Sequence, residues 1–536
     1  MEASSDLPSR KVLVVVPQVS ALDKLVVVAR GADEGSSEGL ISLGSCAAAT
    51  VAAFVPSDMS VAIHDETLAD LDFTTDADCI AITANVSQAR RAIEIANAFR
   101  ALGKTVLMGG PHVSLAPHLL EDCADSIVVG ELEGIAELVF DDLRAGCLKP
   151  RYDGSRPSLA LSPMPRWDLY PRDSALMGVV QTSRGCPFEC NFCDVIQYLG
   201  RNQRHKPIAN VLAELQALYD LGFAMVSLAD DNLTVYRQHA RELLTAIAQW
   251  NGAEGREPVV LNTQLSIDLA RDPDLMQLCV DAGMTTAFIG IESGSAEALT
   301  EALKRQNLRI DIREQCEKLT RAGLQIHAGL IVGFDSDDKT AFERQFDFAM
   351  RLPVPIFNVN ILVAPVATPL FDKMKAEGRI LEDRAIAEMP VGGLASNFRL
   401  ARISDDEANI GARWLISRLL APENFIKRLR YTCDILGPTR WAREGRARRA
   451  PPRRVQVLMG GAMRRMLRDF DGGLQVFKEA QRLSRQRPDI QDRIQDIVSQ
   501  YFDVVRTYRG NGIYDDKLAL LLKPPFSEDP HCAEPA

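Results

Sequence analysis

The sequence predicts an α/β protein in three parts. A doubly wound, Rossmann-like parallel sheet is expected over residues 1–150, a partial (β/α)6 barrel over residues 178–400 and a mainly helical region over residues 401–536. Short apolar runs typical of strands alternate with segments of helical period through about residue 400. A proline-rich stretch at residues 151–177 interrupts this alternation and predicts a linker without regular structure.

The first part contains five apolar runs that predict strands: Lys11–Val16, Met59–His64, Asp78–Thr83, Thr105–Met108 and Ser126–Val129. A helix is predicted over residues 88–102, where apolar side chains recur on one face. Doubly wound sheets bind ligands at the carboxyl ends of their strands. Three of these ends carry small or polar residues, namely Thr83, Gly109 with Gly110, and Gly130 with Glu131. No G-x-G-x-x-G follows the first strand, so a dinucleotide is disfavoured.

In the linker, Trp167 and Tyr170 are expected to pack the segment against the barrel. Barrel strands are predicted at residues 178–182, 223–228, 259–263, 286–291, 325–332 and 356–363, with helices such as 207–221, 274–282 and 311–322 between them.

Beyond the barrel, helices are predicted at residues 405–420, 461–470 and 489–508. Residues 440–454 between them hold seven arginines and one acid. This segment is expected to be a solvated loop, with a surface that attracts an anionic substrate, a phosphate or membrane headgroups as the alternative.

Composition limits the function classes. With 46% apolar and 25% charged residues the chain is typical of globular proteins, and its net charge of −11 argues against nucleic-acid binding. No apolar run approaches the roughly 18 residues of a membrane span, which leaves peripheral membrane contact open. The eleven cysteines are too dilute for a disulfide scaffold, so a reducing, cytoplasmic location is expected.

The most informative segment is a cysteine-rich loop at residues 184–194. Cys186, Cys190 and Cys193 have the spacing C-x3-C-x2-C, and Phe192 directly precedes the third cysteine. Three thiolates either borrow a distant fourth ligand, as in a zinc site, or leave one metal position open for chemistry. The loop resembles that of the radical S-adenosylmethionine (SAM) superfamily. The resemblance implies that the cysteines hold a [4Fe-4S] cluster whose open iron chelates SAM and cleaves it to a 5'-deoxyadenosyl radical.

The same resemblance suggests further SAM contacts. Asp230 follows the next strand, where the family binds the amino group of SAM. Glu292 ends a later strand and is expected either to accept from the ribose hydroxyls or to cap a helix. Gly329 and Gly333 match the start of the family's G-x-I-x-G-x-x-E pattern, in which backbone packs against adenine, but Ser336 replaces the acid.

The first part resembles the cobalamin-binding domain of cobalamin-dependent radical SAM enzymes, because Met108–His112 and Val129–Glu133 precede the barrel. The resemblance places cobalamin beside Thr83, Gly109, Gly110, Gly130 and Glu131. Residues 17–25 contain no histidine, so cobalt is expected to lack a histidine ligand from this domain. His112 is expected to be either a turn residue or a residue behind those that contact the cofactor.

The whole chain most resembles a subgroup that contains hopanoid methylases and uncharacterised relatives. This implies a C-methyltransferase that acts on an unactivated carbon of a small-molecule or lipid substrate, with flavodoxin or ferredoxin as electron donor. A non-methylating enzyme that forms or contracts rings or oxidises its substrate, and a non-catalytic cobalamin or metal sensor, remain as alternatives. The sequence leaves the substrate and the oligomeric state open.

Overall fold

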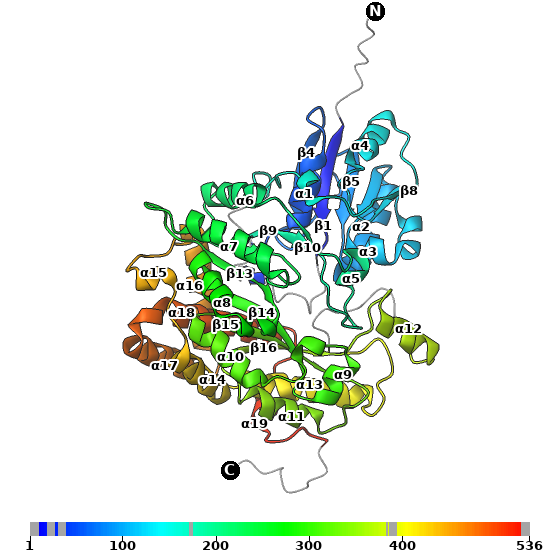
Figure 1. The fold of residues 1–536 in the computed structure, drawn as a ribbon. Helices are drawn as coiled ribbons and strands as arrows, with labels where there is room; N and C mark the ends of the chain where they lie inside the picture. Colours follow the sequence, from blue (N-terminus) through cyan, green and yellow to red (C-terminus); the bar gives the residue numbers. More distant parts are fainter. Residues whose placement is uncertain are drawn as a thin grey trace, which may run out of the picture.

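The computed structural model describes residues 10–18, 27–30, 39–170, 175–381, 384 and 394–526. Two parallel sheets lie next to each other, the first blue and cyan and the second mostly green in Figure 1. Helices coloured yellow to red cover the second sheet on the side away from the first. The predicted α/β architecture with a helical carboxyl-terminal region is therefore confirmed.

The first sheet has six parallel strands in the order β4-β1-β5-β6-β7-β8. They are β1 (Lys11–Val16), β4 (Ser60–Asp65), β5 (Cys79–Thr83), β6 (Thr105–Gly109), β7 (Ser126–Val129) and β8 (Arg151–Asp153). Strand β8 lies inside the segment predicted to have no regular structure, so that expectation was wrong there. The strand is only three residues long, which is too short to show a periodic pattern.

Helices cover both faces of this sheet. They are α1 (Cys46–Phe54), α2 (Ala89–Ala101), α3 (Pro111–Leu115) and α4 (Ala136–Ala145). Val12 and Val14 of β1 pack with α1 and α4, whereas Val15, from the opposite face of the strand, belongs to the core with α2. A strand with cores on both faces reads as a continuous apolar run, which is the pattern at residues 11–16.

The second sheet contains six parallel strands in the order β16-β15-β14-β13-β12-β9. They are β9 (Ala175–Val180), β12 (Met225–Leu228), β13 (Val260–Leu265), β14 (Met284–Glu292), β15 (Gln325–Val332) and β16 (Ile356–Ile361). The connecting helices are α6 (Ile208–Asp220), α7 (Arg237–Asn251), α8 (Pro273–Ala282), α10 (Ile312–Ala322) and α11 (Ala341–Ala349), and they lie along one face of the sheet (Figure 1). This is the predicted partial barrel.

Two further strands extend the second sheet from an unexpected part of the chain. Strand β3 (Gly39–Leu43) pairs parallel to β9, and β2 (Val27–Arg30) pairs antiparallel to β3. The chain therefore leaves the first sheet after β1, adds two strands to the barrel sheet and returns to the first sheet through α1 and β4. No strand was predicted for either segment.

The carboxyl-terminal helices are α13 (Asp405–Leu420), α14 (Pro422–Ile435), α15 (Arg440–Arg443), α16 (Arg453–Asp469), α17 (Gly473–Gln486), α18 (Gln491–Gly510) and α19 (Asp516–Leu520). Helix α18 closes the amino end of the barrel, since the fully buried Arg493 donates to the carbonyls of Gly323 and Thr285 beside the starts of β15 and β14. The opposite, carboxyl end of the strands is where parallel barrels build their sites.

The arginine-rich segment is packed against the protein, contrary to the expected solvated loop. Arg440 donates to the carbonyl of Ala248, and Arg448 forms an ion pair with Asp496. The guanidinium of Arg449 lies 3.8 Å from the ring centroid of Tyr219. Helix α16 begins at Arg453, within this segment and eight residues before the predicted helix start at Gly461. These arginines hold the carboxyl-terminal helices against the barrel helices. The number of charges in the segment does not reveal that role.

The two linker aromatics are buried as expected. Trp167 is 1% exposed and Tyr170 is 3% exposed, and the Trp167 ring lies 6.3 Å from that of Phe223 beside the barrel. The Tyr170 hydroxyl donates to Asp65 at the end of β4. Within the described ranges, no helix is both long and apolar enough to cross a membrane.

Candidate functional site

The cysteine loop is held between two short paired strands. Strands β10 (Ser183–Arg184) and β11 (Arg204–His205) pair antiparallel, and the amide of Cys186 donates to the carbonyl of Gly200. Gly185 has φ +100°, and a Cβ there would lie 2.8 Å from the Gly200 oxygen. Only glycine allows this close approach. The loop therefore leaves the carboxyl end of β9 in a defined turn.

Inside the loop, Cys190 and Cys193 are joined by a turn, in which the amide of Cys193 donates to the carbonyl of Cys190. Burial, Asp194 and the other two thiols together raise the pKa of Cys193 to about 12. Ten cysteines lie in the described part of the chain and all are free thiols. In that part, no three Cys, His, Asp or Glu side chains already stand close enough to hold a metal ion. The loop thus presents three thiols together without a preassembled site.

The loop is anchored to the other end of the barrel sheet. Asn191 bonds to the carbonyls of Glu301 and Ala302 at the end of α9 (Ala296–Glu301), and its own carbonyl accepts from Leu370 in α12 (Pro369–Ala376). Phe192 packs against the apolar cluster that contains Leu370. The aromatic residue therefore fixes the loop in place.

The two acids after β12 have different positions. Asp230 is 1% exposed and accepts from the hydroxyls of Thr182 and Ser183, at 2.9 and 2.6 Å, and from the Ser183 amide. Burial raises its pKa to about 7 against these hydrogen bonds. Asp231 accepts from the amide of Gly185 at 3.2 Å and lines the cavity described below. Asp230 therefore braces the base of the cysteine loop, and Asp231 is the acid that faces open space.

Glu292 ends β14 with φ +66° and forms an ion pair with Lys304 at 2.7 Å. Burial opposes the charge of Lys304, but Glu292 and the nearby Cys190 and Cys193 outweigh it, so the pKa of Lys304 is raised. The helix cap that was one reading of Glu292 is supplied by Ser295, whose hydroxyl accepts from the amide of Ala298. Glu292 and Lys304 thus form a charged pair next to the cysteine loop.

The two predicted glycines, Gly329 in β15 and Gly333 directly after it, border this region differently. A Cβ on Gly329 would lie 3.3 Å from the Phe288 ring and 3.6 Å from a Glu292 oxygen, so the missing side chain leaves room beside both. Gly333 has φ +112°, and its amide donates to Asp337 at 2.9 Å. Asp337 lies one residue after Ser336 and supplies an acid to this turn. Asp337 therefore supplies an acid next to Ser336, the position at which the family pattern has one.

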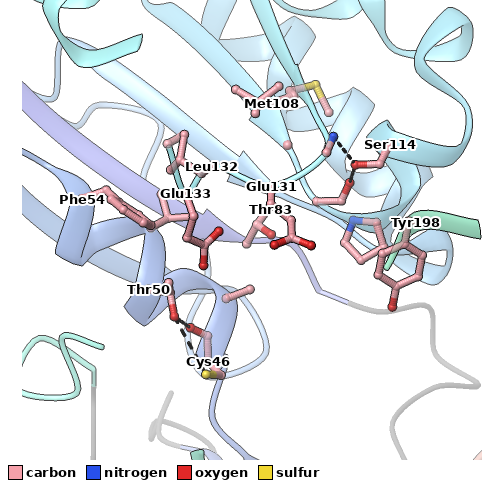
Figure 2. Close-up of a pocket in the computed structure, with 18 of the residues that line it drawn as sticks. Cys46, Thr50, Phe54, Thr83, Met108, Ser114, Glu131, Leu132, Glu133 and Tyr198 are labelled. Carbon is pink, nitrogen blue, oxygen red and sulfur yellow. Dashed lines mark hydrogen bonds between the residues drawn. The ribbon is translucent and has the colours of Figure 1, made fainter. Parts of the chain in front are cut away.

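A cavity of about 380 Å³ lies between the first sheet and the barrel. All five residues predicted from the first sheet line it, at the carboxyl ends of β5, β6 and β7: Thr83, Gly109, Gly110, Gly130 and Glu131. The barrel contributes Gln181, Arg184, Tyr198 and Asp231. In Figure 2 Thr83, Glu131 and Glu133 point into the same space, and Ser114 bridges to the backbone beside them.

Two of the three glycines that line this cavity are required by the turns that form it. Gly110 has φ +106°, and a Cβ there would lie 2.7 Å from the Ala84 carbonyl oxygen. Gly130 has φ +89°, and its Cβ would lie 2.4 Å from the Gly154 oxygen. A Cβ on Gly109 meets only Val128, at 3.8 Å. Two of the three glycines are therefore explained by backbone packing, and Gly109 leaves free space.

Charged side chains join the two sheets across this cavity. Arg184, two residues before Cys186, donates to Glu131 at 2.7 Å and to Glu133 at 2.8 Å. Arg204 forms a second ion pair with Glu131, and Ser162 donates to Glu133 at 2.9 Å. Each of the two glutamates is less than 10% exposed. The cysteine loop and the last turn of the first sheet are thereby fixed relative to each other.

His112 is 3% exposed, and burial lowers its pKa. Its amide donates to Ala84, and its side chain is not among the described residues that line the cavity, none of which is a histidine. His112 is the second residue of the short helix α3 and is not a turn residue. A position behind the cofactor contacts stays a prediction. Part of the histidine-free segment, residues 19–25, lies outside the described residues.

Several residues of the site, Arg184 among them, were missed in the sequence. Lys304 follows Glu292 by a loop and helix, and Tyr198 and Cys46 enter the cavity from α5 (Val195–Tyr198) and from α1. No motif marks Lys304 or Cys46. Tyr198 had a weak signal, since it closes the short segment that follows the third cysteine.

Comparison with known proteins identifies relatives of this chain. Residues 180–349 match the model of the radical SAM superfamily. An uncharacterised methyltransferase of Synechocystis sp. is 33% identical over 345 residues, which is 62% of this chain and 63% of the relative. The hopanoid C-2 methylase of Rhodopseudomonas palustris is 28% identical over 341 residues, 62% of this chain and 64% of that enzyme. The alignments thus span less than two thirds of these relatives.

Solved structures share the fold. The cobalamin-dependent SAM radical enzyme OxsB, with aqua-cobalamin and SAM bound, gives a TM-score of 0.56 at 14% identity and covers 95% of this chain and 82% of its own. The radical SAM methyltransferase TsrM from Kitasatospora setae gives a TM-score of 0.51 at 18% identity, over 69% of this chain and 76% of TsrM. Membership of the superfamily implies a [4Fe-4S] cluster and SAM. Residues 180–349 therefore form a radical SAM domain, and the chain is related in sequence to hopanoid and uncharacterised methyltransferases and similar in fold to cobalamin-binding radical SAM enzymes.

Proposed function

We propose that this protein is a cobalamin-dependent radical SAM C-methyltransferase. The observation that carries the proposal is the cavity between the sheets, because one space is lined both by the predicted cobalamin residues and by Arg184, Tyr198 and Asp231 around the cysteine loop. Residues from two different sheets therefore line one space. A protein that bound only SAM would need no cavity between the first sheet and its cysteine loop.

The residues present fit the expected groups. Cys186, Cys190 and Cys193 would hold the cluster, since thiolates are the usual ligands of iron-sulfur centres. The Glu292 and Lys304 pair beside these cysteines, with the space left by Gly329, is suited to the polar end and ribose of SAM. Thr83, Gly109 and Glu131 would border cobalamin. When bound, the cluster and SAM supply a 5'-deoxyadenosyl radical, and cobalamin supplies the methyl group.

The protein's own contribution is positioning and exclusion of water. Glu131 and Glu133 hold Arg184, and Asp230 holds Thr182 and Ser183, so the base of the cysteine loop is fixed from two sides. The carboxyl-terminal helices close the far end of the barrel. The proposal includes a reducing, cytoplasmic compartment, which keeps the three cluster cysteines reduced, and flavodoxin or ferredoxin as the electron donor.

The test is analysis of SAM products from anaerobically purified protein, reconstituted with iron, sulfide and cobalamin and then reduced. A methyltransferase releases both 5'-deoxyadenosine and S-adenosylhomocysteine, because one SAM is cleaved and a second donates a methyl group. 5'-Deoxyadenosine without S-adenosylhomocysteine, in the presence of substrate, would indicate a non-methylating radical enzyme. Absence of both, with cluster and cobalamin bound, would indicate the sensor.

A further inference from the structure

The inner face of the partial barrel is unusually polar for the interior of a sheet. Along β13, β14, β15 and β16, residues that face the covering helices are apolar and buried, such as Leu261, Ile289, Ile326 and Val359. The alternating residues face the other way, as the period of two in a strand requires. Polar residues on this face include Asn262, Gln264, Thr286, Gln325, His327, Asn358 and Asn360.

The strand register places this row next to the proposed SAM residues. Gly290 is opposite Gly329, Gln264 is opposite Phe288, and Asn360 is opposite Ile331. Phe288 precedes Gly290 by two residues and Ile331 follows Gly329 by two, so each lies about 7 Å along its strand from the glycine pair. Gln264 and Asn360 therefore lie on either side of the level at which SAM is proposed to bind.

Only some of these polar side chains form hydrogen bonds within the protein. Asn262 contacts the Met177 sulfur at 2.9 Å, and His327 pairs with Asn358 at 3.1 Å. The side chains of Gln264, Thr286 and Asn360 make no hydrogen bond in the described part of the chain, and Gln264 is exposed although it lies in the middle of the sheet. Burying an unpaired polar group costs about 1–3 kcal/mol. Three such groups would strongly disfavour a purely hydrocarbon occupant.

We propose that the substrate of this enzyme is a polar, water-soluble molecule whose hydrogen-bonding groups pair with Gln264, Thr286 and Asn360, rather than a hydrocarbon lipid. Phe288 and Ile331 are partly exposed between these residues and provide an apolar contact for the carbon skeleton that carries the reacting C–H bond. Sites built to hydrogen-bond a substrate reject analogues that lack those groups, because their own polar groups are then left unpaired. This inference rests on the proposed function and names its substrate class.

The test uses the reconstituted holoenzyme with [methyl-²H₃]SAM and two probes, an aqueous extract and a hexane extract of cells that produce this protein. The expected result is that the aqueous extract stimulates 5'-deoxyadenosine formation and the hexane extract does not. Stimulation by the hexane extract overturns the inference, and so does lack of stimulation by both. Transfer of deuterium to a product is scored separately, so stimulation by the aqueous extract without deuterium transfer refutes methyl transfer while it retains the polar substrate.

Variants test the residues themselves. Gln264→Leu and Asn360→Leu are each expected to lower the stimulated rate about tenfold, as loss of a buried hydrogen bond predicts. Gln249→Leu, at an exposed position on the outer helix α7, is the matched control and should keep the stimulated rate. Iron content and melting temperature report folding, and the isosteric Thr286→Val carries the test if a leucine variant fails to fold. Unchanged rates in all three inner variants would refute the assignment.

Discussion

Replacement of Arg184 by methionine tests the link between the two sheets. The Arg184 side chain is 12% exposed and donates to Glu131, Glu133 and Gln181 at 2.7 to 2.8 Å. Methionine keeps much of the apolar stem and removes the charge. Glu131 keeps its ion pair with Arg204, but Glu133, which is 3% exposed, keeps only the hydroxyl of Ser162.

The size of the effect follows from which partner is left unpaired. Removing one member of a buried ion pair costs about 3–5 kcal/mol because the other charge stays buried. Since one of the two glutamates remains paired, we expect a loss of about 3 kcal/mol in the free energy of unfolding. Glu133→Gln in the Arg184→Met background should recover about 1–2 kcal/mol, since it removes the uncompensated charge.

Urea denaturation of the apoprotein followed by tryptophan fluorescence measures both changes, because Trp167 lies between the two sheets. The matched control is Arg151→Met, which breaks an exposed pair with Asp153 at 2.6 Å and should cost less than about 1 kcal/mol. If Arg184→Met costs no more than this control, or if the double variant recovers nothing, the ion pairs do not join the sheets as described.

Three further predictions concern the loop, a histidine pair and a turn. Cys186→Ala should abolish SAM cleavage and leave cobalamin binding intact, whereas exposed Cys147→Ala should retain both; cleavage in the first variant would contradict the cluster assignment. Burial and stacked His239 lower the pKa of His205 to about 4, so the unfolded chain binds more protons between pH 4 and 6.5. The free energy of unfolding should therefore rise by about 1 kcal/mol across that range, after allowance for partial exposure, and His205→Phe should flatten the rise in denaturation series. Gly110→Ala should cost more than about 2 kcal/mol from strain and the clash with Ala84, and exceed Gly103→Ala, which has φ +75° but open space, in thermal unfolding.

The alternation of strands and helices was predictable because each element buries a regular set of side chains. Val12, Val14 and Val15 have neighbours on both faces of β1, so the run itself indicates a central parallel strand. The loop cysteines were predictable because their chemistry depends on local spacing. The cavity residues followed from the rule that parallel sheets bind ligands where their strands end.

The parts that were missed depend on contacts between distant segments. Lys304 is significant only because folding places it 2.7 Å from Glu292, and Arg449 only because Tyr219 lies beneath it. Strand β3 pairs with a strand more than a hundred residues away. Side-chain periodicity reports which face of an element is buried and does not report the partner, so these pairings have no signal within their own segments.

The path of β2 and β3 affects how this protein can be taken apart. A cut at residue 150 would remove two strands from the barrel sheet and leave one edge of β9 with unpaired backbone, a surface that favours aggregation. During synthesis, β3 must wait for β9 to emerge before these two strands can pair. Exchange of the amino-terminal part between relatives should therefore succeed only when β2 and β3 stay with the barrel sheet that they extend. The boundary of a working chimaera must follow the two sheets, and a single cut along the chain cannot do so.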